Sequence, residues 1–514
     1  MPGFEDPPSS DEDAGRPGIP VPGGIINASS PVIAEVDGNR QNGKELVAAS
    51  ADGYVHAYRS DGSRLWTTRT PNYQCGGSTN RIHSSPAVGD LLGDGKPEVV
   101  IGYGGISSDC AGGVVALRGT TGRQLWHFSL PRWGQVANFR ERMHGVFSTP
   151  AIADVDGDGK QEVAFGGFDR RLYLLNGRGQ VRWFLAAADT VFASPSFFDI
   201  DGDRKQEIIA ATDISQNPAL RPPTENGGIL YALSSTAKSN PTLEYPFRSS
   251  RVVKWLTPLD QVLYGSPTIA EVDPKNDGPE IVQASGCFFP EGTTQKRGNW
   301  VKVISAKNGS ILHTFKIPTC SASTPAVGDL NEDGNLDIVV TVNGYKPYGG
   351  DGLSRLVAID VKKKRRLWTT VLTEPEGHND LAGNFMSPVI ADVDGNGSLE
   401  VLASNFRTVG IYDGKTGVIL TCADRSCSNG NSTILRTKGG GWPIKSSPAV
   451  GDLDGDGVLE VVVGANGGSA NPDQGALYVW TGLAGLITSP PGIHTPYSAP
   501  WPQFKGGAKR GGRR

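Results

Sequence analysis

The feature that most constrains this chain is an acidic loop between two short apolar runs, which recurs along the sequence. Its clearest copy follows Ser148-Thr-Pro-Ala-Ile-Ala and contains Asp154, Asp156, Asp158, Lys160 and Glu162 before a second apolar run. Alternate acids in a tight turn direct several carboxylates at one centre, and the main-chain carbonyl of Lys160 can complete an oxygen cage. This pattern predicts a site for a hard cation such as Ca²⁺.

A Ser/Thr-Pro pair opens each repeat. The pairs end at Pro31, Pro86, Pro150, Pro195, Pro267, Pro325, Pro388 and Pro448. In each unit, a small-residue run, the acidic loop and an aliphatic run precede a Gly-rich connection and further runs. Units of this length with several strands each indicate propeller blades. We expect an all-β chain with one β-propeller of eight four-stranded blades, or seven if the first repeat is only partial.

Aromatic residues end the fourth run of the first six repeats, and we expect them to pack between neighbouring blades. They are Trp66, Trp126, Trp183, Trp255, Phe315 and Trp368. The last repeat lacks a clear fourth strand, so residues near 24–27 or 501–504 are expected to close the ring. Residues 1–23 are predicted to be a flexible acidic and Pro-rich tail, 24–504 the propeller and 505–514 a flexible basic tail.

This pattern of loops and strands closely resembles the FG-GAP (VCBS-type) repeats of calcium-binding β-propellers, the family that includes the integrin α-subunit head. The resemblance covers about residues 24–504 and is most specific in the Asp-x-Asp-Gly-Asp-Gly loops and in residues 461–468. It implies about four or five structural Ca²⁺ sites. Outer turns such as residues 119–126 also resemble those of quinone-dehydrogenase propellers, but no adjacent Cys-Cys pair is present.

Four loops match the cation pattern best, and a fifth carries Arg204 where glycine is preferred. The predicted ligands of the five loops are Asp154, Asp156, Asp158, Lys160 and Glu162; Asp199, Asp201, Asp203 and Glu207; Asp329, Asn331, Asp333 and Asp337; Asp392, Asp394, Asn396 and Glu400; and Asp452, Asp454, Asp456 and Glu460. The alternative is that the loops are Asx-type turns held by their own backbone, without metal.

Three further loops are irregular. The loop that begins at Asp90 has Leu92 at its third position, which offers no oxygen, so a full cage is not expected there. The loops that begin at Glu35 and Glu271 carry insertions and are interpreted as metal-free turns.

The loop-rich face is the candidate binding surface. In an up-and-down blade, the acidic loops lie on one face, whereas second-to-third loops and blade connections lie on the other, where the long insertions fall. The candidate ligand residues of this opposite face are Tyr73, Arg81, His83, Trp133, Arg140, His144, Phe288, Phe289, Tyr345, Tyr348 and His378. Aromatic residues with Arg and His nearby suit sugar or protein recognition, although they also suit packing of the loops themselves.

The six cysteines form local pairs in the predicted topology. We expect the disulfides Cys75–Cys110, Cys287–Cys320 and Cys422–Cys427, of which the first two pin long loops of the opposite face. Such bridges are typical of an oxidising compartment. The alternatives are unpaired cysteines in the cytosol or a zinc site, but no CxxC or His-Cys ligand set is present.

The charge pattern and the apolar content limit the kinds of binding partner that we expect for this chain. The net charge is -4, yet the acids are concentrated in the loops, so bound Ca²⁺ would leave a positive remainder that suits an anionic partner such as an acidic glycan. A scattered, solvated Lys and Arg surface is the alternative. No run approaches the length of a membrane span, residues 1–24 hold no secretory h-region, and no nucleic-acid motif is found.

We therefore expect a secreted, cell-surface or periplasmic binding or adhesion module for a glycan or protein, with structural calcium and no assigned catalytic residue. One alternative is a polysaccharide lyase on the same fold, for which His83, His144, His378 and Arg140 are the candidate base and charge neutraliser. The other is a structural subunit of an extracellular assembly. Fold alone does not decide among them, and the sequence leaves the oligomeric state open.

Overall fold

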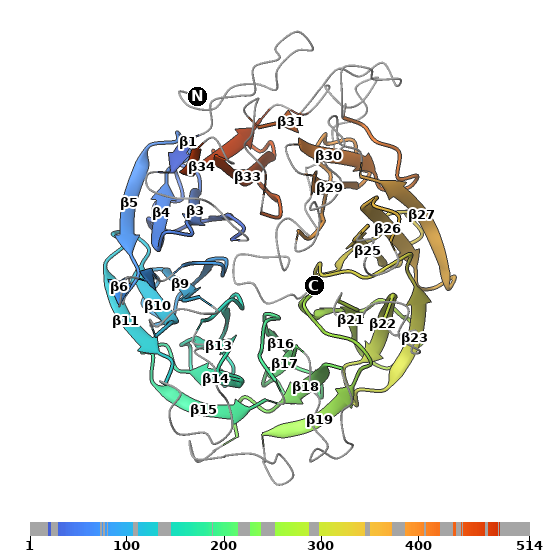
Figure 1. Ribbon diagram of the computed structural model, residues 1–514, viewed down its shortest axis with the longest axis horizontal. Helices are drawn as coiled ribbons and strands as arrows, with labels where there is room; N and C mark the ends of the chain where they lie inside the picture. Colours follow the sequence, from blue (N-terminus) through green and yellow to red (C-terminus); the bar gives the residue numbers. More distant parts are fainter. Residues whose placement is uncertain are drawn as a thin grey trace.

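The protein is a ring of β-sheets (Figure 1). The structure is a computed structural model that describes residues 19–21, 29–71, 74–75, 78–79, 81–105, 111–131, 145–187, 189–213, 227–237, 252–286, 298–344, 350–372, 386–405, 408–421, 435–437, 444, 446–467, 471–481 and 483. Eight four-stranded antiparallel sheets surround one axis, which confirms the predicted all-β, eight-bladed propeller.

Blades 1–7 each run in sequence order from an inner to an outer strand (Figure 1). Blade 1 holds β2 (Val32–Ala34), β3 (Glu45–Ala49), β4 (Tyr54–Tyr58) and β5 (Arg64–Arg69). Blade 2 holds β8 (Ala87–Gly89), β9 (Glu98–Tyr103), β10 (Gly113–Arg118) and β11 (Gln124–Ser129). Blade 3 holds β12 (Ala151–Ala153), β13 (Glu162–Gly166), β14 (Arg171–Leu175) and β15 (Val181–Ala186). Blade 4 holds β16 (Ser196–Phe198), β17 (Glu207–Ala211), β18 (Ile229–Leu233) and β19 (Val253–Pro258).

The second half of the ring repeats the pattern. Blade 5 holds β20 (Thr268–Ala270), β21 (Glu280–Ala284), β22 (Trp300–Ser305) and β23 (Ile311–Lys316). Blade 6 holds β24 (Ala326–Gly328), β25 (Asp337–Val342), β26 (Arg355–Asp360) and β27 (Arg365–Val371). Blade 7 holds β28 (Val389–Ala391), β29 (Glu400–Asn405), β30 (Thr408–Asp413) and β31 (Leu435–Arg436). Blade 8 holds β32 (Ala449–Gly451), β33 (Glu460–Gly467) and β34 (Asn471–Trp480). Outside the blades, a short hairpin of β6 (Gln74–Cys75) and β7 (Ser78–Thr79) follows blade 1.

The ring closes through the N-terminal part of the chain. Strand β1 (Ile19–Val21) is the outermost strand of blade 8 and pairs with β34 in the register Ile19↔Leu477. The sequence predicted correctly that blade 8 lacks a fourth strand of its own, but residues 19–21 supply this strand, and the predicted closing residues 24–27 and 501–504 lie outside the described residues. These three residues of the predicted 1–23 tail therefore belong to a sheet, because the free edge of β34 offers backbone groups that need partners.

The hydrophobic core lies between adjacent blades. In the seam of blades 1 and 2, for example, Val47 and Ala49 of β3 belong to the same cluster as Val99 and Ile101 of β9. Middle strands are buried on both faces, so they read as continuous apolar runs instead of alternating ones. Each blade is thus stabilised mainly by its two neighbours.

The outer aromatic residues dock onto the next blade, as predicted for blade packing. The Trp66 indole N–H donates to the carbonyl of Gly119 at 2.5 Å, and Trp368 donates in the same way to Gly414 at 2.8 Å. Gly122, at φ +66°, lies against the Trp66 ring so closely that a Cβ there would come within 2.6 Å of it. Glycine is therefore required at this turn by both its backbone angle and the close approach.

A closed belt of hydroxyl groups connects all eight blades. The Ser or Thr before each repeat proline accepts a hydrogen bond from the main-chain N–H of the equivalent residue one blade earlier. The belt runs from Ser30 through Ser85, Thr149, Ser194, Ser266, Thr324, Ser387 and Ser447, whose N–H returns to Ser30, with donor–acceptor distances of 2.7–3.1 Å. All eight residues are buried. The Ser and Thr residues of the Ser/Thr-Pro pairs therefore join neighbouring blades at the inner side of the ring.

Removing one belt hydroxyl should destabilise the whole propeller. Ser266→Ala leaves the buried N–H of Ser194 without its acceptor, which costs about 1–3 kcal/mol. Ser266→Thr is the matched control, because threonine fills this position in blades 3 and 6. Chemical denaturation should show a lower free energy of unfolding for the alanine variant alone. Equal stability of Ser266→Ala and the parent chain would contradict the role of the belt.

Candidate cation sites and the opposite face

Every second strand begins with a buried acid that closes the preceding loop. The eight acids are Glu45, Glu98, Glu162, Glu207, Glu280, Asp337, Glu400 and Glu460, and none has more than 3% of its surface exposed. In each blade, one carboxylate oxygen accepts the N–H of the second loop residue, at 2.6–3.2 Å. These acids hold the loop geometry independently of any cation, and they leave their second oxygen for a further partner.

Among the described residues, five loops bring three acids together within 4.8 Å of one another, as a cation cage requires. The groups are Glu35, Asp37 and Glu45; Asp154, Asp156 and Glu162; Asp199, Asp201 and Asp203; Asp392, Asp394 and Glu400; and Asp452, Asp454 and Glu460. Four of the five predicted loops are thus represented. Within these four loops, the predicted carboxylates of Asp158, Glu207 and Asp456 lie outside the groups.

The Asp329 loop of blade 6 is the predicted loop that does not gather its acids. The Asn331 side-chain amide donates to both oxygens of Asp337, at 2.9 and 3.1 Å. Lys363 lies 2.6 Å from Asp333 and, with Asn335, lowers the pKa of that carboxyl to about 2. The sequence prediction counted Asn331 as an oxygen donor, whereas the structure uses its N–H groups.

A basic side chain already occupies the acidic loop in three consecutive blades. In blade 2, Arg118 reaches Glu98 at 2.7 Å and Asp94 at 3.1 Å. In blade 3, Arg182 reaches Glu162 at 3.0 Å and Asp156 at 2.8 Å.

Blade 4 repeats this arrangement, because Lys254 lies 2.6 Å from both Glu207 and Asp201. A tethered guanidinium or ammonium group thus supplies part of the positive charge in these three loops.

In the irregular loop of blade 5, different side chains pair with the acids. His313 lies 2.6 Å from Asp273, and Lys307 lies 2.7 Å from Asp277. Asn276 donates to Glu280, so the acids of this loop have polar or charged partners within the chain. They form no three-acid group in the described residues.

The loops of blades 7 and 8 carry the most strongly perturbed acids. Burial, reinforced by Asp394 and Asp392, raises the pKa of Glu400 to about 9. Burial likewise raises the pKa of Glu460 to about 8, and the neighbouring Asp454 adds to the effect. Each of these carboxylates would therefore be stabilised in its charged form by a bound divalent cation.

The raised pKa values predict a pH-dependent response of metal-stripped protein. The pKa of each of these acids is higher in the folded protein than its ordinary value of 4.5. Such an acid contributes its full stabilisation of the fold below about pH 4.5, and this stabilisation is lost as the pH rises toward the folded pKa of about 8 or 9. Chelator-treated protein should therefore melt at lower temperature at about pH 8 than at about pH 5.5, and Ca²⁺ should raise the melting temperature more at the higher pH. Scanning calorimetry at both values tests this. An equal effect of Ca²⁺ at both pH values would contradict it.

On the opposite face, the structure describes two of the predicted ligand residues. Arg81 is exposed and His83 is partly exposed, and both lie just before the inner strand of blade 2. The other nine predicted residues lie outside the described residues.

The sequence analysis predicted His83 on this face but missed three further aromatic residues that lie in a row with it. His83, Phe147, Phe192 and Tyr264 each lie three residues before a repeat proline, at the inner ends of blades 2–5, and we call them the aromatic arc. Neighbouring ring centroids along the arc are 4.2, 5.7 and 5.4 Å apart, and all four side chains are partly exposed. The signal was available in the sequence, because the spacing to the proline is constant.

Asp213 lies on the same face, directly after β17 and close to the arc in blade 4. One of its oxygens accepts a hydrogen bond from the Thr190 hydroxyl at 3.0 Å, and Thr190 is two residues before Phe192. The other oxygen is buried and makes no hydrogen bond. Burial raises the pKa of Asp213 to about 7, and Asp189 adds to the effect.

The cysteine predictions are largely beyond the described part of the chain. Only Cys320 has a described side chain, which is buried and belongs to a disulfide. Its partner lies outside the described residues, as do the side chains of the remaining cysteines, so the three pairings stay predictions.

The ring of eight blades and its repeated acidic loops define the class of protein: an eight-bladed β-propeller assembled from acidic-loop repeats. Residues 446–480 match the FG-GAP repeat family, which confirms the predicted resemblance. Residues 28–203 also match the family described as outer membrane protein assembly factor BamB. No curated protein matches the chain in sequence.

Solved structures share the fold at low identity. The biofilm matrix protein Bap1 of V. cholerae is 14% identical, with 94% of this chain and 89% of that chain covered and a TM-score of 0.51. The exotype rhamnogalacturonan lyase YesX is 17% identical, with 90% and 75% covered and a TM-score of 0.51. At such identities the likeness concerns the fold alone. The described residues contain no helix able to cross a membrane.

Proposed function

We propose that this protein is a calcium-stabilised binding module, located outside the cytosol, which recognises a glycan through the face opposite the acidic loops. The observation that carries this proposal is the aromatic arc. Four partly exposed rings follow one another over four consecutive blades and form one edge of aromatic surface. Rings of this kind give large, rigid contact area for the apolar faces of pyranose rings.

The belt makes the aromatic arc a preordered surface. Each arc residue lies two positions before a belt residue, so the backbone that carries the ring is fixed to both neighbouring blades. A surface that is already ordered loses little conformational entropy on binding. The described Arg81 lies two residues before His83 and supplies positive charge for an acidic sugar.

Calcium has a structural role in this proposal. The acidic loops lie at the other end of the inner strands from the arc, and a cation in a loop that lacks a basic partner would tie the first strand of that blade to its second strand. The fold similarity to a biofilm matrix protein and the FG-GAP repeat agree with a module that works on an extracellular or periplasmic surface. The predicted disulfides would suit the same compartment.

A polysaccharide lyase is the second candidate, and Asp213 is the observation that favours it. An acid with a pKa near 7 beside the aromatic arc is suited to remove a proton from a sugar carbon. Asp213 joins the earlier candidates His83, His144, His378 and Arg140, of which only His83 is described. The third candidate, a structural subunit, would place the same face against a partner protein.

Binding to immobilised plant and microbial polysaccharides, followed by calorimetry with the best acidic oligosaccharide, tests the proposal. Phe192→Ala should weaken that binding at least tenfold, which equals about 1.4 kcal/mol, because it interrupts the arc. Phe184→Ala is the control, since this partly exposed ring lies on the outer strand β15 and packs beside Arg171.

Three other outcomes would overturn the binding-module proposal. Unsaturated, ultraviolet-absorbing products that disappear in Asp213→Asn would establish the lyase instead. A discrete oligomer or filament without glycan affinity would favour the structural subunit. Undiminished glycan binding by Phe192→Ala would show that the ligand does not bind at the aromatic arc.

A further inference from the structure

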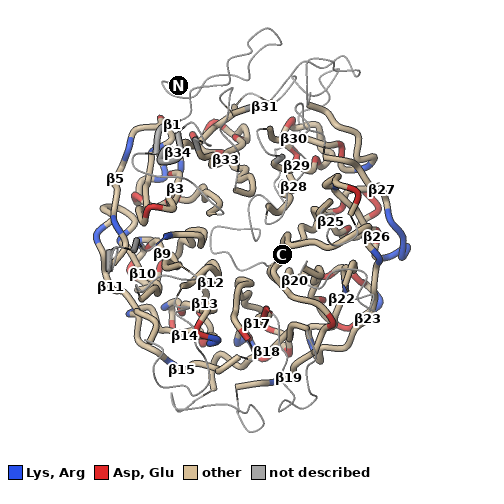
Figure 2. Tube along the Cα trace, viewed as in Figure 1, with Lys and Arg blue, Asp and Glu red and all other residues tan. Residues whose placement is uncertain are grey.

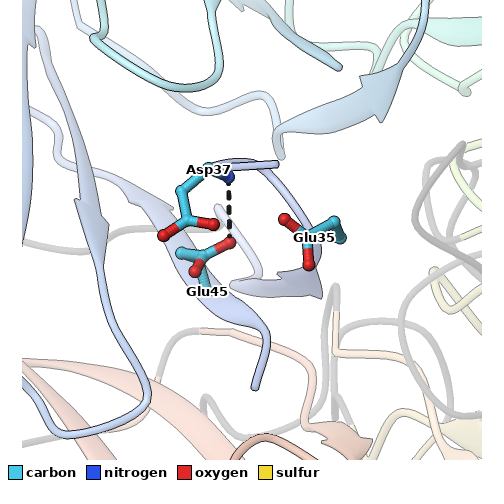
Figure 3. A group of neighbouring side chains, drawn as sticks. All are labelled: Glu35, Asp37 and Glu45. Atoms are coloured by element: carbon cyan, nitrogen blue, oxygen red, sulfur yellow. Dashed lines mark hydrogen bonds between the residues drawn. The ribbon is translucent and has the colours of Figure 1, made fainter. Parts of the chain in front are cut away.

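The loop of blade 1 builds an acidic group from a sequence that departs from the repeat pattern. Figure 3 shows Glu35, Asp37 and Glu45 directed at a common centre, with the Asp37 N–H bonded to one Glu45 oxygen at 3.2 Å. Ligand atoms of the three acids lie within 4.8 Å of one another. Glu35 also accepts the N–H of Gly38 at 2.7 Å, as Asp154 accepts that of Gly157 in the regular loop of blade 3.

Two buried oxygens in this loop have no hydrogen-bond partner. Glu45 is completely buried; one of its oxygens accepts from Val36 and Asp37, and the other, Oε1, makes no hydrogen bond. The inserted residue Asn42 donates its amide to Asp37 at 3.0 Å, while its own Oδ1 is also buried and without a hydrogen bond. An unpaired buried carboxylate oxygen is costly, so such a pair of oxygens indicates a missing positive partner.

No basic side chain among the described residues supplies that partner. Arg182 and Lys254, which enter the loops of blades 3 and 4, are both the extra residue at the bulge in the outer strand. The same position in blade 1 is Leu65, which packs into the core. Blade 1 therefore has a buried acid like those of blades 3 and 4, but an apolar residue at the position from which those two blades supply a basic side chain.

We propose that Glu35, Asp37, Asn42 and Glu45 bind a Ca²⁺ ion, and that this ion stabilises the junction at which the ring closes. Three carboxylates and an amide oxygen form a hard, anionic ligand set, which main-chain carbonyls and water complete to the usual 6–8 oxygens. The irregular loop suits Ca²⁺ better than Mg²⁺, because Mg²⁺ demands near-ideal octahedral geometry. The site is independent of whatever the opposite face binds.

The blade 1 loop is fastened directly to the acidic loop of blade 8. The Lys44 N–H donates to the Leu453 carbonyl at 2.7 Å, while the Leu453 N–H donates to Glu460 at 2.6 Å. Equivalent contacts between blades 2 and 3 and between blades 3 and 4 measure 3.4 Å. Gly43, at φ +85°, lies so close to Leu453 that a Cβ would come within 2.3 Å of its carbonyl oxygen.

Cation binding in blade 1 should therefore couple to binding in blade 8. An ion held by Glu45 fixes the adjacent Lys44, which bonds the same Leu453 residue that bridges to Glu460. Each ion orders part of the other ion's loop, so each should increase the affinity of the other.

Isothermal titration of Ca²⁺ into chelator-stripped full-length protein tests the site. Glu45→Gln keeps an oxygen acceptor for Val36 but removes the charge, and it should lower the Ca²⁺ stoichiometry by one ion and reduce the Ca²⁺-dependent rise in melting temperature. Asp37→Asn should give the same result and serves if the first variant folds poorly. Glu98→Gln is the matched control, because Arg118 already contacts the equivalent acid of blade 2, and its stoichiometry should equal that of the parent chain.

A double-mutant cycle of Glu45→Gln with Glu460→Gln should show non-additive losses of Ca²⁺-dependent stability. Unchanged stoichiometry in both Glu45→Gln and Asp37→Asn would overturn the site, and additive losses would overturn the coupling. Glycan binding is measured separately on Ca²⁺-saturated protein, so a failure of the proposed function leaves this result unaffected.

Discussion

The fold depends on the closed belt of Ser and Thr hydroxyls around the ring axis. Each inner strand is only three residues long, so its own ladder supplies few hydrogen bonds. The belt adds one buried bond per blade, and each bond joins two blades. The proline that follows each hydroxyl fixes the backbone angle at the start of the strand, and the aromatic arc lies on the segment just before it. The belt thus determines the geometry of the inner strands, on which both faces are built.

Charge compensation in the acidic loops differs around the ring, although the loops have similar sequences. In blades 2–4, Arg118, Arg182 and Lys254 neutralise the acids from within the chain. In blades 7 and 8, Glu400 and Glu460 are buried beside further aspartates, which makes their charged forms unfavourable. Figure 2 shows Lys and Arg along outer strands such as β5 and β27, with many of the acids nearer the axis. Cations would therefore matter most in the part of the ring that contains its closure.

The repeat pattern predicted the architecture well, because the Ser/Thr-Pro pairs and apolar runs report interactions that recur in every blade. The docking of Trp66 and its equivalents was predictable for the same reason. The closing strand was not, since three residues within a Pro-rich segment carry no periodic signal. Local patterns also did not reveal the side-chain arrangement of two loops: the Asn331 amide donates to Asp337, and Glu45 lies with Glu35 and Asp37 across an insertion. Basic partners such as Lys254, 53 residues after Asp201, lie too far along the chain for a loop motif to reveal.

The central claim is that divalent cations occupy the loops which lack an internal cation. The most direct test is crystallography of the protein grown with Tb³⁺ as a Ca²⁺ substitute, read from the anomalous difference map. The account predicts strong peaks beside Glu400, Glu460 and Glu45, and none beside Glu98, where Arg118 remains in place. A Tb³⁺ ion bound beside Glu98 in place of Arg118, with no peak in the loops of blades 1, 7 and 8, would contradict it.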